Sequence, residues 1–208
     1  MSDASLSVLH VWVHGARPEV HDYHSGNEGD FERLAGQLGQ ARRSGIEVIA
    51  TTMLTRSNLA VIGEVPAFLA ARGIRAWRVA VARAGAGAEA EAEDGPSTVF
   101  VRLALALPYA LHALTRASRS GIETYVAGAP LCLLGPFAAH ALPTTEGAYG
   151  DACEACPAQS ACPGVDGRYL ARFDGDELRP RSTPTPPTPP RTERWAASFS
   201  GVMDPGRG

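Results

Sequence analysis

Alternation of short apolar segments with amphipathic segments, in units of about thirty residues, dominates the first 126 residues. Buried strands are expected at 9–13, 46–54, 75–81 and 122–126. Helices are expected near 31–44, 59–72 and 98–120, where apolar residues recur at helical spacing. Gly45 and Gly73 are suited to closing the first two helices, Ser57 or Asn58 to starting the second, and Pro108 to kinking the third. Such repeats predict an α/β fold with a mostly parallel sheet and right-handed crossovers.

A polar segment over 17–30 follows the first predicted strand and is expected to be a loop. Residues 14–26 hold three histidines and two carboxylates, namely His14, Glu19, His21, Asp22 and His24. The H-E-x-x-H motif of zinc proteases is absent, so direct metal binding is one interpretation and loop structure or substrate contact is the other. Such a loop belongs at the carboxyl edge of a parallel sheet, where α/β active sites usually lie.

Four cysteines occupy the second half of the chain. Cys132 lies in the apolar run A-P-L-C-L-L, while Cys153, Cys156 and Cys162 form C-x2-C-x5-C followed by P-G. Thiolates are soft ligands for zinc or iron, and four of them fill a tetrahedral zinc site or coordinate a 4Fe-4S cluster. Two disulfides or unrelated free thiols are the alternatives. Disulfides need an oxidising compartment, and the start of the chain lacks the basic segment of a signal peptide. We therefore predict that the cysteines are metal ligands, with iron–sulfur and zinc both open.

Composition excludes several function classes. The formal net charge of −3 and the pI near 6.1 give no electrostatic reason to expect nucleic acid as a partner. All 19 basic residues are arginine, which excludes Schiff-base chemistry and a lysine-containing phosphate loop. The most apolar stretch, 99–114, is too short to span a membrane and contains Arg102 and His112. A cytoplasmic protein that binds no membrane is the expectation.

Changes in composition along the chain predict three regions. An α/β domain is expected over 8–128, interrupted by an acidic, small-residue insertion at 83–97 that should be exposed and mobile. A cysteine-rich metal- or cluster-binding extension is expected over 129–179, and a proline-rich, disordered tail over 180–208. The proline tract is alternatively a ligand for an SH3-like partner domain.

The order of these features resembles the radical SAM protein family. V-x-V-H-G-A-R-P-E-V-H-D-Y-H-S-G over 11–26 is similar to the fourth strand and following loop of such enzymes. R-S-G-I-E-V-I-A-T-T-M-L-T-R-S-N over 43–58 and R-G-I-R-A-W-R-V over 72–79 are similar to their fifth and sixth strands. The tail C-x2-C-x5-C-P-G resembles the cysteine-rich extension that holds an auxiliary 4Fe-4S cluster in many members. The resemblance implies the second half of a partial (β/α)6 TIM-like barrel, with that cluster on Cys132, Cys153, Cys156 and Cys162.

This chain lacks the motifs with which radical SAM enzymes bind their initiating cluster and S-adenosylmethionine. The C-x3-C-x2-C motif that holds the initiating cluster is absent, as is the glycine-rich segment that binds the methionine group. By resemblance, Thr51 and Arg78 would be cofactor-binding residues. Without the resemblance, Arg78 is either half of a structural ion pair or an anion-binding group. S-adenosylmethionine is therefore expected only with a complementing half.

Half a barrel would expose a strand edge and an apolar face. We therefore expect another protein, a complete radical SAM relative or a second copy of this chain to cover them, unless the true start lies further upstream. Radical chemistry would require that the missing half supply the initiating cluster. The alternative function is a non-catalytic zinc-binding or protein-interaction module.

Overall fold

The computed structural model describes residues 8–81, 101–142, 147–182 and 193–200. Its centre is a four-stranded sheet in which every neighbouring pair is parallel and the strands follow chain order, β1-β2-β3-β4. The strands are β1 Val8–Trp12, β2 Glu47–Leu54, β3 Ala76–Val81 and β4 Glu123–Ala127. The predicted α/β class and parallel sheet are thereby confirmed. A strand order without reversal is compatible with a partial α/β barrel.

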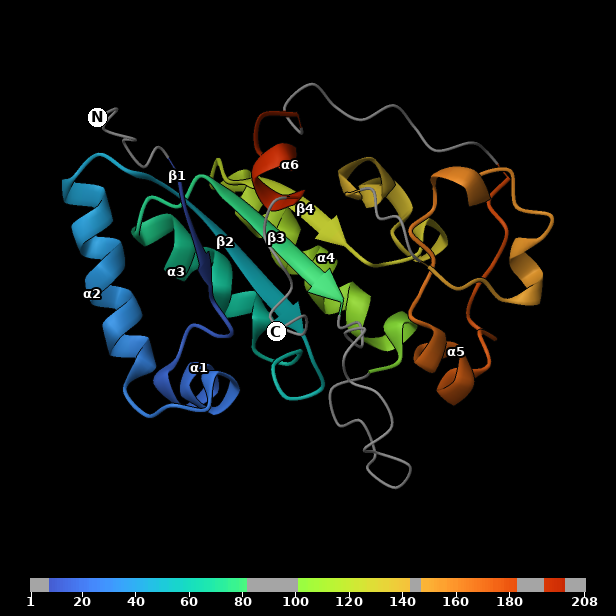
Figure 1. The fold of residues 1–208 in the computed structure, drawn as a ribbon, viewed down its shortest axis with the longest axis horizontal. Coiled ribbons are helices and arrows are strands. Elements are labelled where there is room, and N and C mark those ends of the chain that lie inside the picture. Colours follow the sequence, from blue (N-terminus) through green and yellow to red (C-terminus); the bar gives the residue numbers. More distant parts are fainter. Residues whose placement is uncertain (1–7, 82–100, 143–146, 183–192, 201–208) are drawn as a thin grey trace, which may run out of the picture.

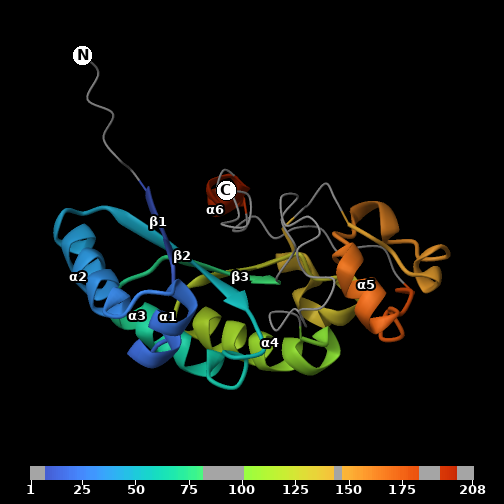
Figure 2. The same cartoon turned by 60° about the horizontal axis from the view of Figure 1, so that its bottom comes forward.

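The connecting helices all cover one face of the sheet, which we call the outer face (Figures 1 and 2). They are α2 Asp30–Arg43, α3 Val65–Ala71 and α4 Leu103–Arg119. The largest apolar core lies between these helices and the outward side chains of the strands, among them Val48, Trp77 and Val126. Trp77, Val79 and Val81 share this face, as their alternation predicts. Pro108 lies inside α4.

The opposite, inner face of the sheet carries polar side chains in its central row. Trp12, Thr51, Arg78 and Tyr125 are register partners across the four strands, so their side chains form one row on this face. Thr51 and Arg78 are buried although the outer helices do not reach them. What covers them is the C-terminal helix α6, Glu193–Ser200, which lies on the inner face in both ribbon views (Figures 1 and 2).

This helix corrects the expectation of a disordered tail over 180–208. Residues 193–200 form α6 because Trp195 and Phe199, one helical turn apart, are buried against the inner face. The proline tract at 183–192 and the end at 201–208 lie outside the described residues, as does the acidic insertion at 83–97.

Two further expectations for the first half are corrected. The segment expected to be a loop contains helix α1, Pro18–Ser25, which begins at a proline and ends at Gly26 in the left-handed conformation. The helix expected over 59–72 is shorter: a 3-10 turn, η1 Ile62–Glu64, leads directly into α3. Asn58 caps no helix. Its side-chain oxygen accepts from the N–H of Thr55, and its amide donates to the carbonyls of His14 and Met53.

The segment after β4 consists of short turns and one helix. These elements are η2 Leu131–Leu133, η3 Gly135–His140, η4 Asp151–Cys153, η5 Gln159–Ala161 and α5 Gly167–Phe173. Asp166 caps α5 by accepting from the N–H of Arg168. The buried Tyr169 hydroxyl accepts from the N–H of Leu103, which fixes α5 to the start of α4. This segment therefore packs as a continuation of the α/β core.

Candidate metal centre

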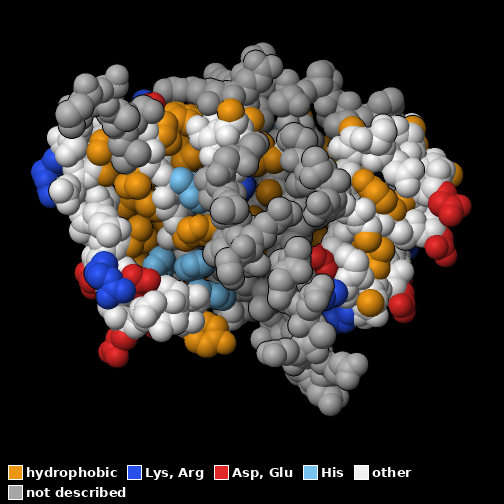
Figure 3. All heavy atoms as spheres, viewed as in Figure 1, with side chains coloured by type: hydrophobic (Ala, Val, Ile, Leu, Met, Phe, Trp, Pro, Cys, Tyr) orange, Lys and Arg blue, Asp and Glu red, His pale blue; other side chains and the backbone are white. Residues whose placement is uncertain are grey.

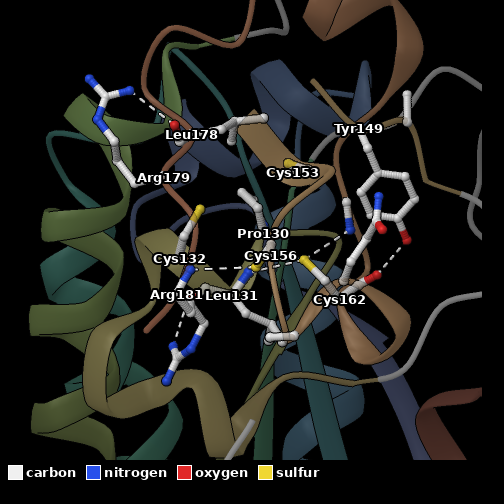
Figure 4. A pocket seen from close by; sticks show the side chains of 14 residues that line it. Pro130, Leu131, Cys132, Tyr149, Cys153, Cys156, Cys162, Leu178, Arg179 and Arg181 are labelled. Atoms are coloured by element: carbon white, nitrogen blue, oxygen red, sulfur yellow. Dashed lines mark hydrogen bonds between the residues drawn. The ribbon is translucent and has the colours of Figure 1, made fainter. Parts of the chain in front are cut away.

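The four cysteines come together although they lie on separate turns. Cys132 lies in η2, directly after β4, where Pro130 holds the chain extended. Cys153 ends η4, and Cys162 follows η5. Cys156 lies between these two turns. All four cysteines line one cavity, and each is half-buried (Figure 4). The spacing C-x2-C-x5-C predicts that the last three are neighbours; the end of β4 brings the first to them.

Main-chain N–H groups point at two of the sulfurs. Cys162 Sγ accepts from the N–H groups of Leu131 and Gly164, and Cys156 Sγ accepts from the N–H of Arg181, each at 3.4 Å (Figure 4). Donors of this kind stabilise negative charge on sulfur and are typical of thiolates bound to metals. The cavity is therefore suited to charged sulfur ligands.

Electrostatics connects the thiols. Burial raises the pKa of Cys132, and the neighbouring Cys162 and Cys153 raise it further. Burial likewise raises the pKa of Cys153, with Cys162 and Cys156 adding to the effect. Thiols that raise one another's pKa in this way are close neighbours. With pKa values raised above that of an ordinary thiol, Cys132 and Cys153 are protonated at pH 7 when no cation is near them, and none of the four cysteines forms a disulfide.

Among the described residues, which include all four cysteines, no group of three or more His, Cys, Asp or Glu side chains could hold a single metal ion. A tetrahedral zinc would draw four sulfurs to about 2.3 Å from one centre. A 4Fe-4S cluster binds each sulfur to a different iron, so its ligands stand further apart.

The remaining wall of the cavity is mainly apolar, with two arginines, Arg179 and Arg181. Pro130, Leu131, Ala158 and Leu178 contribute apolar surface. Arg181 also lines the cavity; one of its terminal nitrogens donates to the carbonyl of Leu131 at 3.0 Å. Its Nε is buried and has no hydrogen-bond partner among the described residues.

Thr51 and Arg78, the two cofactor-binding residues implied by the resemblance, are brought together on the inner face. Arg78 Nε donates to Thr51 Oγ1 at 3.0 Å, and the same hydroxyl lies 2.8 Å from His10 Nε2. Burial, together with the positive charge of Arg78, lowers the pKa of His10 to about 4. Arg78 also donates to the main-chain carbonyl of Phe199 in α6, at 3.1 Å. Sequence reasoning missed His10 and Phe199 in this group.

The histidines of the first loop form a separate cluster. The ring centres of His21 and His24 lie 5.4 and 5.5 Å from that of His14, and histidine side chains gather on one part of the surface (Figure 3). Burial, reinforced by the other two rings, lowers the pKa of His14 to about 4, so this cluster is neutral at pH 7. His24 Nε2 lies 2.9 Å from the Ser57 hydroxyl. In the described part of the chain these histidines form no group able to hold a metal ion.

The carboxylates near these histidines have structural roles. Asp22 accepts from the N–H groups of Gly29 and Phe31, both at 2.7 Å, and so fixes the start of α2. Glu19 is exposed at the start of α1. The loop-structure interpretation therefore accounts for Asp22.

No family model, no curated protein and no solved structure matches the chain. Within the described ranges, no helix has both the length and the apolar character needed to cross a membrane.

Proposed function

We propose that this chain binds a 4Fe-4S cluster through Cys132, Cys153, Cys156 and Cys162. The observation that carries the proposal is that four free cysteines from three separate turns line one cavity. Their main-chain N–H donors suit thiolates bound to either metal. The resemblance of the C-x2-C-x5-C-P-G tail to an auxiliary-cluster extension favours the cluster over zinc.

The donor set also limits what such a cluster would do. When bound, a 4Fe-4S cluster supplies one-electron chemistry. Four cysteine ligands would leave no iron free for a substrate, which favours electron relay over substrate binding. Leu131, Gly164 and Arg181 would tune the centre through their N–H groups. The apolar wall would limit the access of water.

We infer further that the chain is related to the C-terminal half of radical SAM proteins and that its cluster is auxiliary. The sequential parallel sheet supports this inference, because a barrel requires strands in chain order with helices on one side. Radical chemistry would then need a partner, or an upstream half, that carries the initiating cluster and S-adenosylmethionine. The edge of β1 that faces away from β2 is the natural docking place for such a half. A cytoplasmic location fits the four free thiols.

The decisive experiment measures iron, zinc and acid-labile sulfide per chain after anaerobic purification. About four irons and four sulfides are expected for the wild type. The Cys153→Ala variant should lose them, while Ser160→Ala, an exposed hydroxyl in the same loop, should keep them. About one zinc without sulfide would replace the proposal with the zinc-binding module. No metal in the wild type, even after reconstitution with iron and sulfide, would refute both.

The enzymatic part needs its own test. The reconstituted chain, mixed with a candidate partner and S-adenosylmethionine under reducing conditions, should yield 5′-deoxyadenosine above the amount that the partner makes alone. An unchanged yield with complete radical SAM relatives would leave a cluster-binding protein without this activity.

A further inference from the structure

Helix α6 is attached to the inner face by two aromatic side chains. Trp195 is 3 % exposed and Phe199 is 1 % exposed. Together they form a second apolar cluster, separate from the main core, with Ile49, Ala76, Tyr125 and Leu142. The exposed Ala197 lies on the solvent side of the helix. The inner face is thus covered by α6, which is the last described element in chain order.

Phe199 lies directly over the polar row of the inner face. Its carbonyl accepts from Arg78 Nη1 at 3.1 Å, and the Arg78 guanidinium lies 5.2 Å from the centre of its ring. The ring also meets His10 edge-on at 5.9 Å and Tyr125 at 5.1 Å. One residue of α6 therefore covers Arg78 and the His10–Thr51 pair beside it.

The covering helix has little stability of its own. It is eight residues long, which is shorter than an isolated helix needs to persist in water. Its docking has to offset the loss of conformational freedom of those residues, with two large side chains as the main source of apolar burial. The inner face beneath it is different, because β2 and β3 lie in the middle of the sheet and have a strand on each side. Detaching α6 would leave that sheet and its outer core in place.

We propose that α6 is a reversible cover of the inner face, which detaches while the sheet stays folded. Its detachment exposes Arg78 and Thr51 and increases the exposure of the half-buried His10. Because α6 belongs to the same chain as the sheet, it stays close after it detaches and competes with any ligand of this face. The device is autoinhibitory: a ligand reaches the guanidinium only when the Phe199 carbonyl has left it. This proposal does not depend on the cluster.

Hydrogen exchange of the full chain tests the cover directly. The amides of α6 should exchange roughly a hundredfold faster than those of β3, because they open without global unfolding. Equal protection of α6 and β3 would show that the helix opens only with the whole domain and would overturn the proposal. This measurement uses the wild type alone, so it decides even where a variant fails to fold.

Chemical labelling of His10 gives the second readout. Diethyl pyrocarbonate modifies accessible neutral imidazoles, and peptide mass spectrometry separates His10 from the exposed His112, the internal reference. Phe199→Ala should raise the His10 labelling rate by roughly tenfold or more relative to His112. Ala197→Ser, on the solvent side of the same helix, should leave it unchanged. A folded Phe199→Ala protein that labels His10 at the wild-type rate would overturn the proposal.

Discussion

Replacing Gly147 by alanine should break the contact that holds the Cys162 loop in place. A β-carbon at position 147 would lie 2.0 Å from the carbonyl oxygen of Pro163 and 2.8 Å from its carbon. Both are main-chain atoms next to Cys162, so no side chain can move aside. A β-carbon essentially never lies within 3.0 Å of a heavy atom outside its own residue and the two neighbouring residues. The segment around Gly147 and the segment around Pro163 therefore have to separate by about 1 Å.

The loss in the free energy of unfolding that follows from this separation is estimated from the hydrogen bonds beside it. Ala148 and Val165 exchange two main-chain hydrogen bonds, of 2.8 and 3.0 Å, immediately beside the clash. Moving the segments apart by about 1 Å lengthens both bonds beyond a useful distance. Each is worth about 1 kcal/mol net, and a donor left buried costs more, so we expect a loss of about 2–4 kcal/mol in the free energy of unfolding.

Urea denaturation followed by circular dichroism measures this loss, and metal analysis follows the site. Gly36→Ala is the matched control, because Gly36 lies in α2 with no atom within 4 Å of the added carbon. It should stabilise the protein by about 0.5–1 kcal/mol. Gly147→Ala should also lower the metal content per chain by freeing Cys162. A Gly147→Ala protein within about 0.5 kcal/mol of wild type, with full metal content, would refute the reasoning.

Three other outcomes are expected. His10 and His14 have a pKa of about 4 when folded and 6.5 when unfolded, so acid favours the unfolded chain. Stability should be complete above pH 6.5 and fall by the order of 2 kcal/mol per histidine toward pH 4, allowing for screening; a flat profile in urea titrations would contradict this. Thr52→Val should cost about 2–4 kcal/mol, because the buried hydroxyl accepts from the Trp77 indole at 2.9 Å and donates to the carbonyl after β1. Adding Trp77→Phe should recover part of that loss in the same denaturation assay. Arg181→Met should lower the reduction potential of a bound cluster in a redox titration monitored by electron paramagnetic resonance, and an unchanged potential would exclude this residue from tuning.

The strands were predictable because the central ones are buried on both faces. β2 and β3 read as nearly continuous apolar runs, which is the pattern of parallel strands between two covered faces. Helix α1 was not predictable in this way, since His21 is its only buried residue and its apolar periodicity is correspondingly weak. Its signals were local: Pro18 at the first turn and Gly26 at the end.

The candidate site likewise has one part that the sequence predicts and one part that it does not. Local spacing identifies Cys153, Cys156 and Cys162 as neighbours, whereas the approach of Cys132 depends on where β4 ends. Helix α6 was missed because a proline-rich composition outweighed a pair of aromatic residues at i, i+4. The hydrogen bond between Arg78 and Phe199 of α6 joins residues 121 positions apart, and no local sequence pattern predicts such a contact.

The sequential order of the strands has a consequence for synthesis on the ribosome. Each strand pairs with the one made just before it, so the sheet can assemble from the N-terminus as the chain emerges. The sheet is complete at Ala127, and α6 begins about 65 residues later. At 5–20 residues per second, roughly 3 to 13 s pass before the chain can supply its own cover. For that interval the nascent protein presents its inner face without α6, and a chaperone or an assembly partner can reach that face without competing with the helix.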